Sequence, residues 1–176
     1  MKLYHFSDED DIAIFRPRVK ENRKNMPPVV WAIDEEHQFT FFFPRNCPRI
    51  VYTKHEHISE ADYIRFFGTT DADIVITVET NWYRSIMVTT LYRYELPRDS
   101  FTMFDPTAGY YISYEVVKPI HMTRINNALE RLMDMKIDVR FTPNLNTSRD
   151  ELLKSTIHDF GIHRFDHALK RGPSHD

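Results

Sequence analysis

Short runs of β-branched and aromatic residues, each ended by turn-forming residues, constrain the fold of this chain more than any other feature. Side chains of these kinds pack well on the pleated surface of a sheet, so the runs are typical of β-strands. The clearest run is Ile-Val-Ile-Thr-Val at 74–78, in which every residue is β-branched. We expect strands at 3–6, 29–33, 49–54, 74–78, 90–96, 110–117 and 137–141.

Between these runs, other segments carry helix signals. Ser59 is a good N-cap and Gly68 a good C-terminal stop, so the segment between them is expected to be a helix. Beyond residue 122 the apolar residues recur with helical spacing as far as residue 135. Further helices are expected at 9–15, 34–43, 82–88 and 148–160. Together these patterns predict an α+β fold, with a mixed, mostly antiparallel sheet or sheets and flanking helices.

The length of the chain predicts a single domain that covers residues 1–176. A chain of 176 residues has the size of one ordinary domain, and with 41% hydrophobic residues it can bury a sizeable core. No stretch of Gly, Ser and Pro is long enough to separate two domains, and no internal repeat is found.

Cysteine usage and hydropathy predict the compartment. The single cysteine, Cys47, excludes an intrachain disulfide and a zinc site of several cysteines, which fits a reducing interior. Charged residues interrupt every apolar run well before about 18 residues, so neither a signal peptide nor a membrane span is expected. We therefore expect a soluble cytoplasmic protein without a membrane partner.

The overall charge argues against one class of function. A net charge of −3 and a pI near 6.3 do not fit a dedicated nucleic-acid binder that relies on a strongly positive overall field. Local basic patches remain compatible with this balance.

The first strand carries an unexpected polar residue, His5, next to aromatic neighbours. Because side chains alternate along a strand, Leu3, His5 and Ser7 share one face, and Tyr4 and Phe6 share the other. The acids and turn formers that follow Ser7 place His5 close to a strand end, where sites are often built. We expect His5 and Ser7 to line a concave pocket rather than the core.

The strand expected at 110–117 supplies a candidate acid, Glu115. Alternation places Ile112, Tyr114 and Val116 on the face suited to the core, and Glu115 with Ser113 on the other face. A carboxylate held there can accept a hydrogen bond from a sugar hydroxyl or oppose a developing positive charge. Alternatively, Glu115 faces solvent on a half-exposed strand.

Histidine pairs raise the question of a metal. The chain contains His55-Glu56-His57, and Asp34 and His37 have the spacing of ligands on one helix face. Nine histidines make chance pairs common, and no zinc-enzyme or zinc-finger motif is present. We expect no metal site, and we expect Cys47 to be a small buried apolar residue rather than a nucleophile.

Over nearly its full length the chain resembles a family of uncharacterised bacterial proteins, a domain of unknown function. The resemblance lies in "LYHFSD", "PPVVWAIDEEH", "FPRNCPRI", "TLYRYELP", "GYYISYEVVKPI" and "VRFTPNL". It implies no activity.

More distantly, "LYHFS" followed by a late strand with Glu resembles the ADP-ribosyltransferase superfamily, whose enzymes use NAD as a substrate. This resemblance implies that His5 and Ser7 hold the ribose and that Glu115 is the catalytic acid, assisting the departure of nicotinamide. It also implies an aromatic residue against the nicotinamide, for which Trp31 and Tyr52 are candidates, with Phe42 and Phe43 as further ones. Asp138 on the strand expected at 137–141 is a rival acid.

The same resemblance gives the basic loop a role. Arg16, Arg18, Arg23 and Lys24 follow the His5 strand, and a pyrophosphate needs cationic partners, among which Arg can bind with both ends of its fork. Alternatively, the loop is a solvated charged surface.

Three classes of function therefore remain open. The first is an NAD-dependent ADP-ribosyltransferase-like enzyme acting on an unknown acceptor, with no metal. The second is a non-catalytic domain that binds a nucleotide or another small ligand, and the third is a protein-interaction domain. The sequence gives no indication of the oligomeric state.

Overall fold

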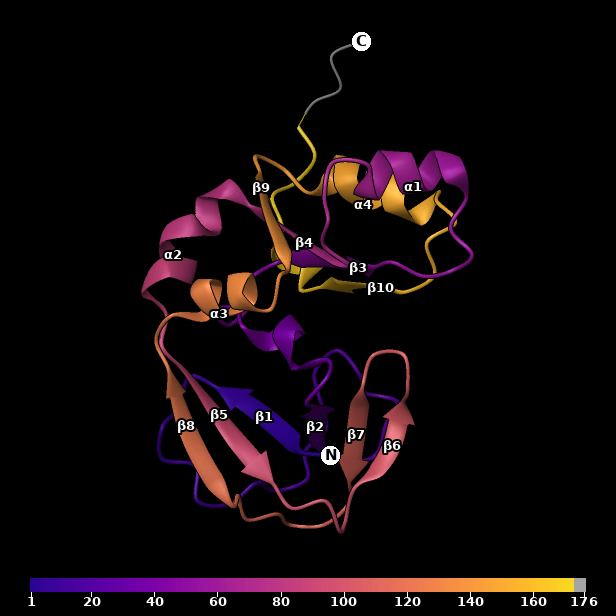
Figure 1. Ribbon diagram of the computed structural model, residues 1–176. Helices are drawn as coiled ribbons and strands as arrows, with labels where there is room; N and C mark the ends of the chain where they lie inside the picture. The colour runs from indigo at the N-terminus through magenta and orange to yellow at the C-terminus, as the bar shows by residue number, and fades with distance from the viewer. Residues whose placement is uncertain (173–176) are drawn as a thin grey trace. The chain divides into compact units, whose positions relative to one another are not determined.

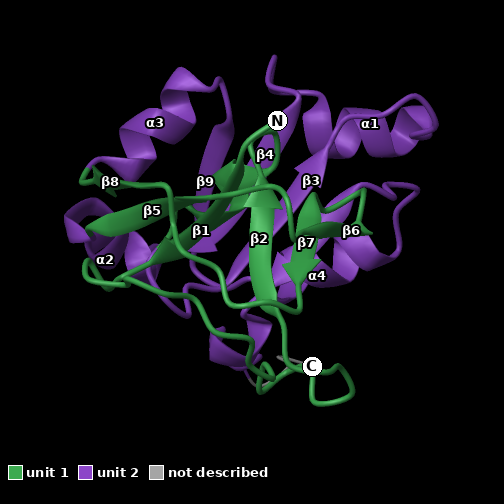
Figure 2. Ribbon diagram, turned by 90° about the horizontal axis from the view of Figure 1, so that it is seen from below, with its two compact units in different colours: residues 1–43, 90–126 green, residues 44–89, 127–176 purple. Residues whose placement is uncertain are grey.

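The computed structural model describes residues 1–172 and has the expected α+β architecture (Figure 1). Within these residues there are four α-helices and two sheets, one antiparallel and one mixed. The contacts divide the chain into two compact units (Figure 2). Unit 1 consists of 1–43 and 90–126, and unit 2 consists of 44–89 and 127–176. Each unit combines two separate segments of the chain, and the single domain stays a prediction.

Unit 1 is built on an antiparallel sheet with the strand order β6-β7-β2-β1-β5-β8. The central strand β1 pairs with β2 on one side and with β5 on the other, so that Leu3 lies opposite both Asp34 and Leu96. A short 3-10 helix, η1, follows β2. The elements of unit 1 are β1 (Leu3–Ser7), β2 (Val30–Asp34), η1 (Gln38–Phe41), β5 (Leu91–Leu96), β6 (Thr102–Asp105), β7 (Tyr110–Ser113) and β8 (His121–Ile125).

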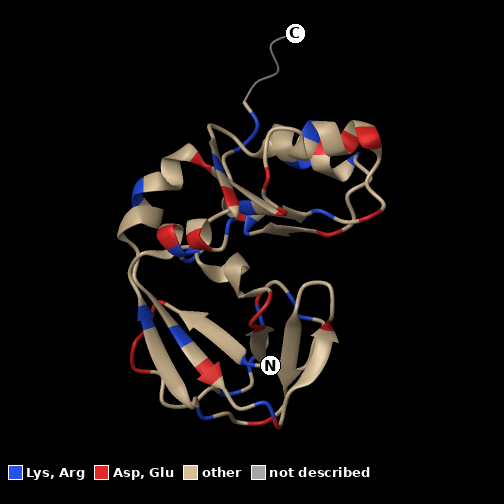
Figure 3. Cartoon of the chain, viewed as in Figure 1, with Lys and Arg blue, Asp and Glu red and all other residues tan. Residues whose placement is uncertain are grey.

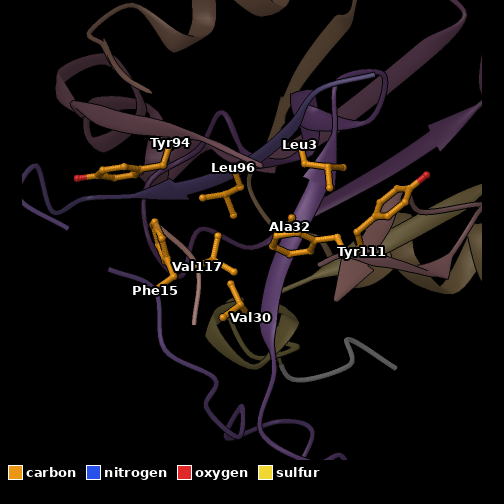
Figure 4. Close-up of a cluster of buried hydrophobic side chains, with 9 residues drawn as sticks. Leu3, Phe15, Val30, Ala32, Tyr94, Leu96, Tyr111 and Val117 are labelled. Carbon is orange, nitrogen blue, oxygen red and sulfur yellow. The ribbon is translucent and has the colours of Figure 1, made fainter. Parts of the chain in front are cut away.

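One face of this sheet bears the core of unit 1. Side chains of β1, β2, β5 and β7 meet there with residues from the connecting segments, as Figure 4 shows for Leu3, Ala32 and Leu96. The connection from β1 to β2 closes over this face, because the Tyr94 hydroxyl donates to the Glu9 carbonyl at 2.7 Å and accepts from the Ile12 N–H at 3.2 Å. The cluster consists of Leu3, Phe15, Val30, Ala32, Tyr94, Leu96, Phe101, Tyr111 and Val117.

The connection from β1 to β2 corrects one expectation. The helix expected at 9–15 is absent, and Phe15 instead forms a two-way backbone pair with Val117, with N···O distances of 2.8 and 2.9 Å. The acids that resemble a helix start belong to the turn that follows Ser7, because the Ser7 hydroxyl accepts from the Glu9 N–H at 3.1 Å. The helix expected at 34–43 is reduced to η1.

Unit 2 is built on a mixed sheet with the strand order β10-β3-β4-β9. Its β4 and β9 run parallel, and the other two pairs are antiparallel. Helices α1 and α4 cover one face, where Phe66, Phe67 and Leu152 pack with Ile50 and Val75 of the sheet. The elements are β3 (Arg49–Thr53), α1 (Glu60–Phe67), β4 (Ile74–Glu79), η2 (Thr80–Trp82), α2 (Tyr83–Val88), α3 (Ala128–Asp134), β9 (Asp138–Thr142), α4 (Asn146–Leu153), β10 (Phe160–His163) and η3 (Phe165–His167).

Helix boundaries follow the sequence signals in some places and not in others. The Ser59 hydroxyl caps α1 by accepting from the Asp62 N–H, and the helix ends at Gly68, as expected. The helix expected at 123–135 is wrong in its first part, which forms β8. No helix in the described part of the chain has the length and apolar character needed to cross a membrane.

Candidate functional site

Register brings five of the sequence-predicted site residues to one end of the unit 1 sheet. Because β1 is antiparallel to β2 and β2 to β7, the end of β1 at Ser7, the start of β2 at Val30 and the end of β7 at Ser113 lie at the same end of the sheet. We call this end the site edge, since it is formed by strand ends and not by an outermost strand. The Phe15–Val117 and Arg18–Val29 pairs add the first part of the basic loop to that edge. The five residues are His5, Ser7, Arg16, Arg18 and Glu115.

His5 is held in one orientation. Its Nδ1 lies 2.9 Å from the Trp31 carbonyl oxygen, and since a carbonyl only accepts, Nδ1 carries the proton. The ring of Phe15 packs against the imidazole with a distance of 4.8 Å between ring centres. In the neutral form Nε2 is then a hydrogen-bond acceptor, to which a hydroxyl group can donate.

The face that bears His5 is the core face of the sheet. Leu3, on the same face of β1, is fully buried, and Tyr94, which pairs with His5, belongs to the core cluster. His5 itself is half-buried at the margin of that cluster. The expected separation between this face and the core is therefore wrong, and a pocket lined by His5 and Ser7 stays a prediction.

Glu115 lies outside the strand on which it was expected. Strand β7 ends at Ser113, whose hydroxyl accepts from the Glu115 backbone N–H at 3.1 Å, and the Glu115 side chain is exposed. Tyr114 and Val116, expected in the core, are 61% and 51% exposed, whereas Tyr111 is buried in it. The local turn at Ser113 competes with the strand ladder and ends the alternation. Glu115 is thus a solvent-accessible carboxylate on a turn, not a carboxylate on a rigid strand.

Trp31 and His5 project from opposite faces of the sheet. Trp31 pairs with Ile112, whereas its neighbour Ala32 belongs to the core cluster on the His5 face. The indole is buried, and the rings of Phe104 and Tyr110 meet it edge to face at 5.1 and 5.8 Å between ring centres. The indole therefore does not face the imidazole, and its predicted contact with a nicotinamide beside His5 has no support in this geometry.

Tyr52 and Asp138 belong to unit 2. The Tyr52 ring packs against Phe66 and Phe67, burial raises the pKa of its hydroxyl, and Arg140 donates to that hydroxyl at 3.2 Å. Arg140 also donates to one Asp138 oxygen from Nε at 3.2 Å and from Nη2 at 3.0 Å. These residues form a packed, hydrogen-bonded group in the sheet of unit 2. The rival acid is therefore an ion-pair partner of an arginine.

The arginines of the basic loop are available to an anion. Arg16 and Arg18 are exposed, and neither forms an ion pair within residues 1–172. Figure 3 shows how Lys and Arg (blue) and Asp and Glu (red) are distributed along the chain. The Arg18 backbone is fixed, because its N–H and carbonyl both pair with Val29 at 3.2 Å. The loop thus presents two unneutralised guanidinium groups at the edge that holds Ser7 and Glu115.

Two buried carboxylates, Glu79 and Asp34, have structural roles that were not predicted from the sequence. Glu79 is fully buried, and its carboxylate accepts from the backbone N–H groups of Leu145 and Leu169 at 3.0–3.4 Å. Asp34 accepts from both the backbone N–H and the Nδ1 of His37 at 2.8 Å. The spacing of Asp34 and His37 was noticed as a ligand pattern, and no sequence signal distinguishes the buried Glu79 from an exposed acid.

Cys47 and the histidine pairs have structural surroundings. Cys47 is buried, and burial raises the pKa of its thiol to about 12, so it is an inert apolar residue. His55 Nε2 accepts from the His158 backbone N–H at 3.0 Å. Residues 1–172 contain no group of three or more His, Cys, Asp or Glu side chains arranged to hold a metal ion.

The fold and this edge define an α+β protein with two sheets and a cationic loop beside a half-buried histidine. The chain belongs to a family of unknown function, DUF6886, whose model matches residues 4–168. No curated protein and no solved structure matches the chain. The family membership agrees with the first resemblance, and no comparison gives a link to the ADP-ribosyltransferases.

Proposed function

We propose that unit 1 binds NAD or a related nucleotide at the sheet edge formed by the ends of β1 and β7, and acts on it as an ADP-ribosyltransferase-like enzyme. The observation that carries the proposal is the gathering of His5, Ser7, Arg16, Arg18 and Glu115 at that edge. In this arrangement a proton acceptor for a hydroxyl, two anion-binding groups and a carboxylate stand on separate short segments. The acceptor of the ADP-ribosyl group is unknown.

The geometry suggests a role for each group. Arg16 and Arg18 would bind the pyrophosphate, because guanidinium groups without carboxylate partners keep their full charge for a ligand. His5, with its proton fixed on Nδ1 by the Trp31 carbonyl, would accept from a ribose hydroxyl through Nε2. Glu115 would oppose the positive charge that develops on the ribose as nicotinamide leaves. No metal is needed for these steps.

The proposed site departs from the ADP-ribosyltransferase pattern at the position of the aromatic residue. Trp31 projects from the face of the sheet opposite to His5, and Tyr52 belongs to unit 2. Phe15 packs against the imidazole, at 4.8 Å between ring centres, and it comes from the segment that closes over the core face. We assign the aromatic wall of the nucleotide site to Phe15.

The test is nicotinamide release from NAD by the purified chain, together with NAD affinity by calorimetry. Glu115→Gln keeps the shape of the side chain and removes the charge that acts mainly in the transition state. Release is expected to fall by about 10²–10³, with a much smaller change in affinity. The double change Arg16→Gln with Arg18→Gln is expected to weaken NAD binding most strongly at low salt.

Two matched controls separate this site from a general effect of charge. Asp138→Asn alters the rival acid in unit 2, and Glu130→Gln removes an exposed carboxylate of α3. Both variants should release nicotinamide at the wild-type rate. If Asp138→Asn abolishes release and Glu115→Gln does not, the acid is wrongly assigned. If the wild-type chain binds NAD without cleaving it, the non-catalytic nucleotide-binding alternative replaces the enzyme. Absence of both binding and cleavage rejects the nucleotide site.

A further inference from the structure

The basic loop comprises residues 16–24. Cations of its second half, residues 20–24, pack against aromatic rings. The Lys20 ammonium lies 4.3 Å from the centre of the Trp31 ring, and the Arg23 guanidinium carbon lies 4.9 Å from the same ring. Arg23 also lies over the ring of Phe104, at 5.5 Å. Contacts of this kind hold a cation in place without cancelling its charge, since the ring carries no net charge.

Few acidic residues within the loop offset its positive charge. The loop contains five cationic residues and one acid, Glu21. Arg16, Arg18, Arg23 and Lys24 are exposed and form no ion pair in the part of the chain that the structure describes. The loop is therefore a positive patch on a chain whose net charge is −3.

Hydrogen bonds hold the backbone that carries these cations. Arg18 pairs with Val29 through both its N–H and its carbonyl group, each at 3.2 Å. Farther along, the Arg23 N–H donates to the Lys20 carbonyl at 2.9 Å, and the Met26 N–H donates to the Arg23 carbonyl at 3.1 Å. Because these hydrogen bonds already order the loop backbone, a ligand that needs several of its cations at once has less backbone entropy to remove on binding.

The patch also offers an exposed aromatic ring for stacking. Phe104 is 38% exposed and lies on β6, an edge strand of the sheet, beside the Arg23 guanidinium. Unpaired bases stack on aromatic side chains and on arginine planes, and this stacking tolerates any base. A cationic loop with an adjoining exposed ring combines the two features by which proteins bind single strands.

We propose that the second half of the basic loop, residues 20–24, and Phe104 form a binding surface for single-stranded nucleic acid. This surface is independent of the nucleotide site proposed above, which uses Arg16 and Arg18 of the first half. Duplex DNA is less suited, because its bases are stacked internally and it would use the cations alone. An anionic membrane surface is less suited too, because membrane-surface binding typically uses an amphipathic helix, whereas the loop is formed of turns and isolated pairs. Arg23 and Lys24 would contact phosphates, and a base would stack on Phe104.

The experiment measures the fluorescence anisotropy of fluorescein-labelled oligo(dT) and oligo(U), each twelve nucleotides long, as the full chain is added. It is done without NAD, at 50 and 200 mM salt. Wild-type binding should weaken steeply with salt. Arg23→Gln should weaken binding at low salt at least fivefold and reduce the slope of log affinity against log salt by about 0.7, the contribution of one phosphate contact. Phe104→Leu keeps apolar volume without the ring, and it should weaken binding several-fold without changing the slope.

Controls keep the result interpretable. Arg84→Gln removes an exposed cation of α2 in unit 2 and should bind like the wild type, and Arg23→Lys should retain the slope. Circular dichroism of each variant shows whether unit 1 remains folded. The proposal is overturned if neither oligonucleotide binds at 50 mM salt, or if Arg84→Gln weakens binding as much as Arg23→Gln. It is also overturned if vesicles containing phosphatidylserine bind the chain through Arg23 while the oligonucleotides do not.

Discussion

At the scale of single residues, Gly109 shows how one backbone angle supports a polar pair. Its φ is +73°, and a Cβ at this position would stand 2.4 Å from His37 Nδ1 and 2.8 Å from Asp34 Oδ1. The Asp34–His37 hydrogen bond, at 2.8 Å, therefore occupies the space that any other side chain would need. Left-handed backbone and close approach together require glycine before β7.

We expect Gly109→Ala to lower the free energy of unfolding by about 2 kcal/mol or more, from backbone strain and from displacement of His37. Denaturant titration measures this change. Gly172→Ala is the matched control, because a Cβ there meets nothing within 4 Å, and it should leave stability unchanged. Adding His37→Ala to Gly109→Ala should recover part of the loss. Equal stability of the two glycine variants would contradict the proposed crowding.

His163 predicts a pH dependence of stability. Burial lowers the pKa of His163 to about 3, with Arg49 and Arg164 adding to the shift, so the folded chain keeps this imidazole neutral. The unfolded chain takes up the proton below about pH 6.5, so stability falls as pH drops from 6.5 toward 3. The contribution is at most about 1.4 kcal/mol per pH unit.

The measurement compares the wild type with His163→Asn by urea unfolding at pH 7, 6 and 5. Because Asn cannot take up a proton, the variant should lose less stability than the wild type as the pH falls. Parallel pH profiles for the two chains would show that His163 is not held neutral by folding.

At the scale of elements, the sequence predicted the inner strands well and, among the four edge strands of the two sheets within residues 1–172, only β9. The strands expected at 29–33, 49–54, 74–78, 90–96 and 137–141 correspond to β2, β3, β4, β5 and β9, with ends that differ by about one residue. The strands that were missed are β6, β8 and β10, and each forms an edge of its sheet. Edge strands carry exposed and polar side chains, as in His-Met-Thr-Arg-Ile of β8, so the apolar pattern that reveals inner strands is weak in them.

The candidate site was predictable only in part, for a related reason. Alternation shows which residues of β1 share a face with His5, but it does not show what covers that face. In β7 the side chains on both faces, Tyr111 and Ile112, are buried, so apolar character could not indicate which face meets the core. The gathering of His5, Ser7, Arg16, Arg18 and Glu115 at one edge depends on strand order, which becomes visible only with the fold.

At the scale of the whole molecule, unit 1 contains every strand pairing of its own sheet. The six strands and the core cluster come from residues 1–43 and 90–126, and both proposed sites lie within these two segments. The intervening segment and the C-terminal one supply the sheet of unit 2. The hydrogen bonds and core packing needed for the unit 1 sheet are therefore present in about 80 residues, a size at which isolated domains are marginally stable.

We therefore predict that a chain in which 1–43 is joined to 90–126 by a flexible Gly-Ser linker folds into the six-stranded sheet. Its far-ultraviolet circular dichroism should be that of a β protein, and the amide groups of β1, which is paired on both sides, should exchange most slowly. Leu3→Ala in this chain removes a fully buried side chain from the core cluster and should unfold it, since such a change costs about 2–5 kcal/mol and the starting stability is small. Val19→Ala, at a 46% exposed position of the basic loop, is the matched control and should remain folded. An unfolded joined chain would mean that the pairings within unit 1 do not suffice, and that its sheet depends on residues 44–89 or 127–176.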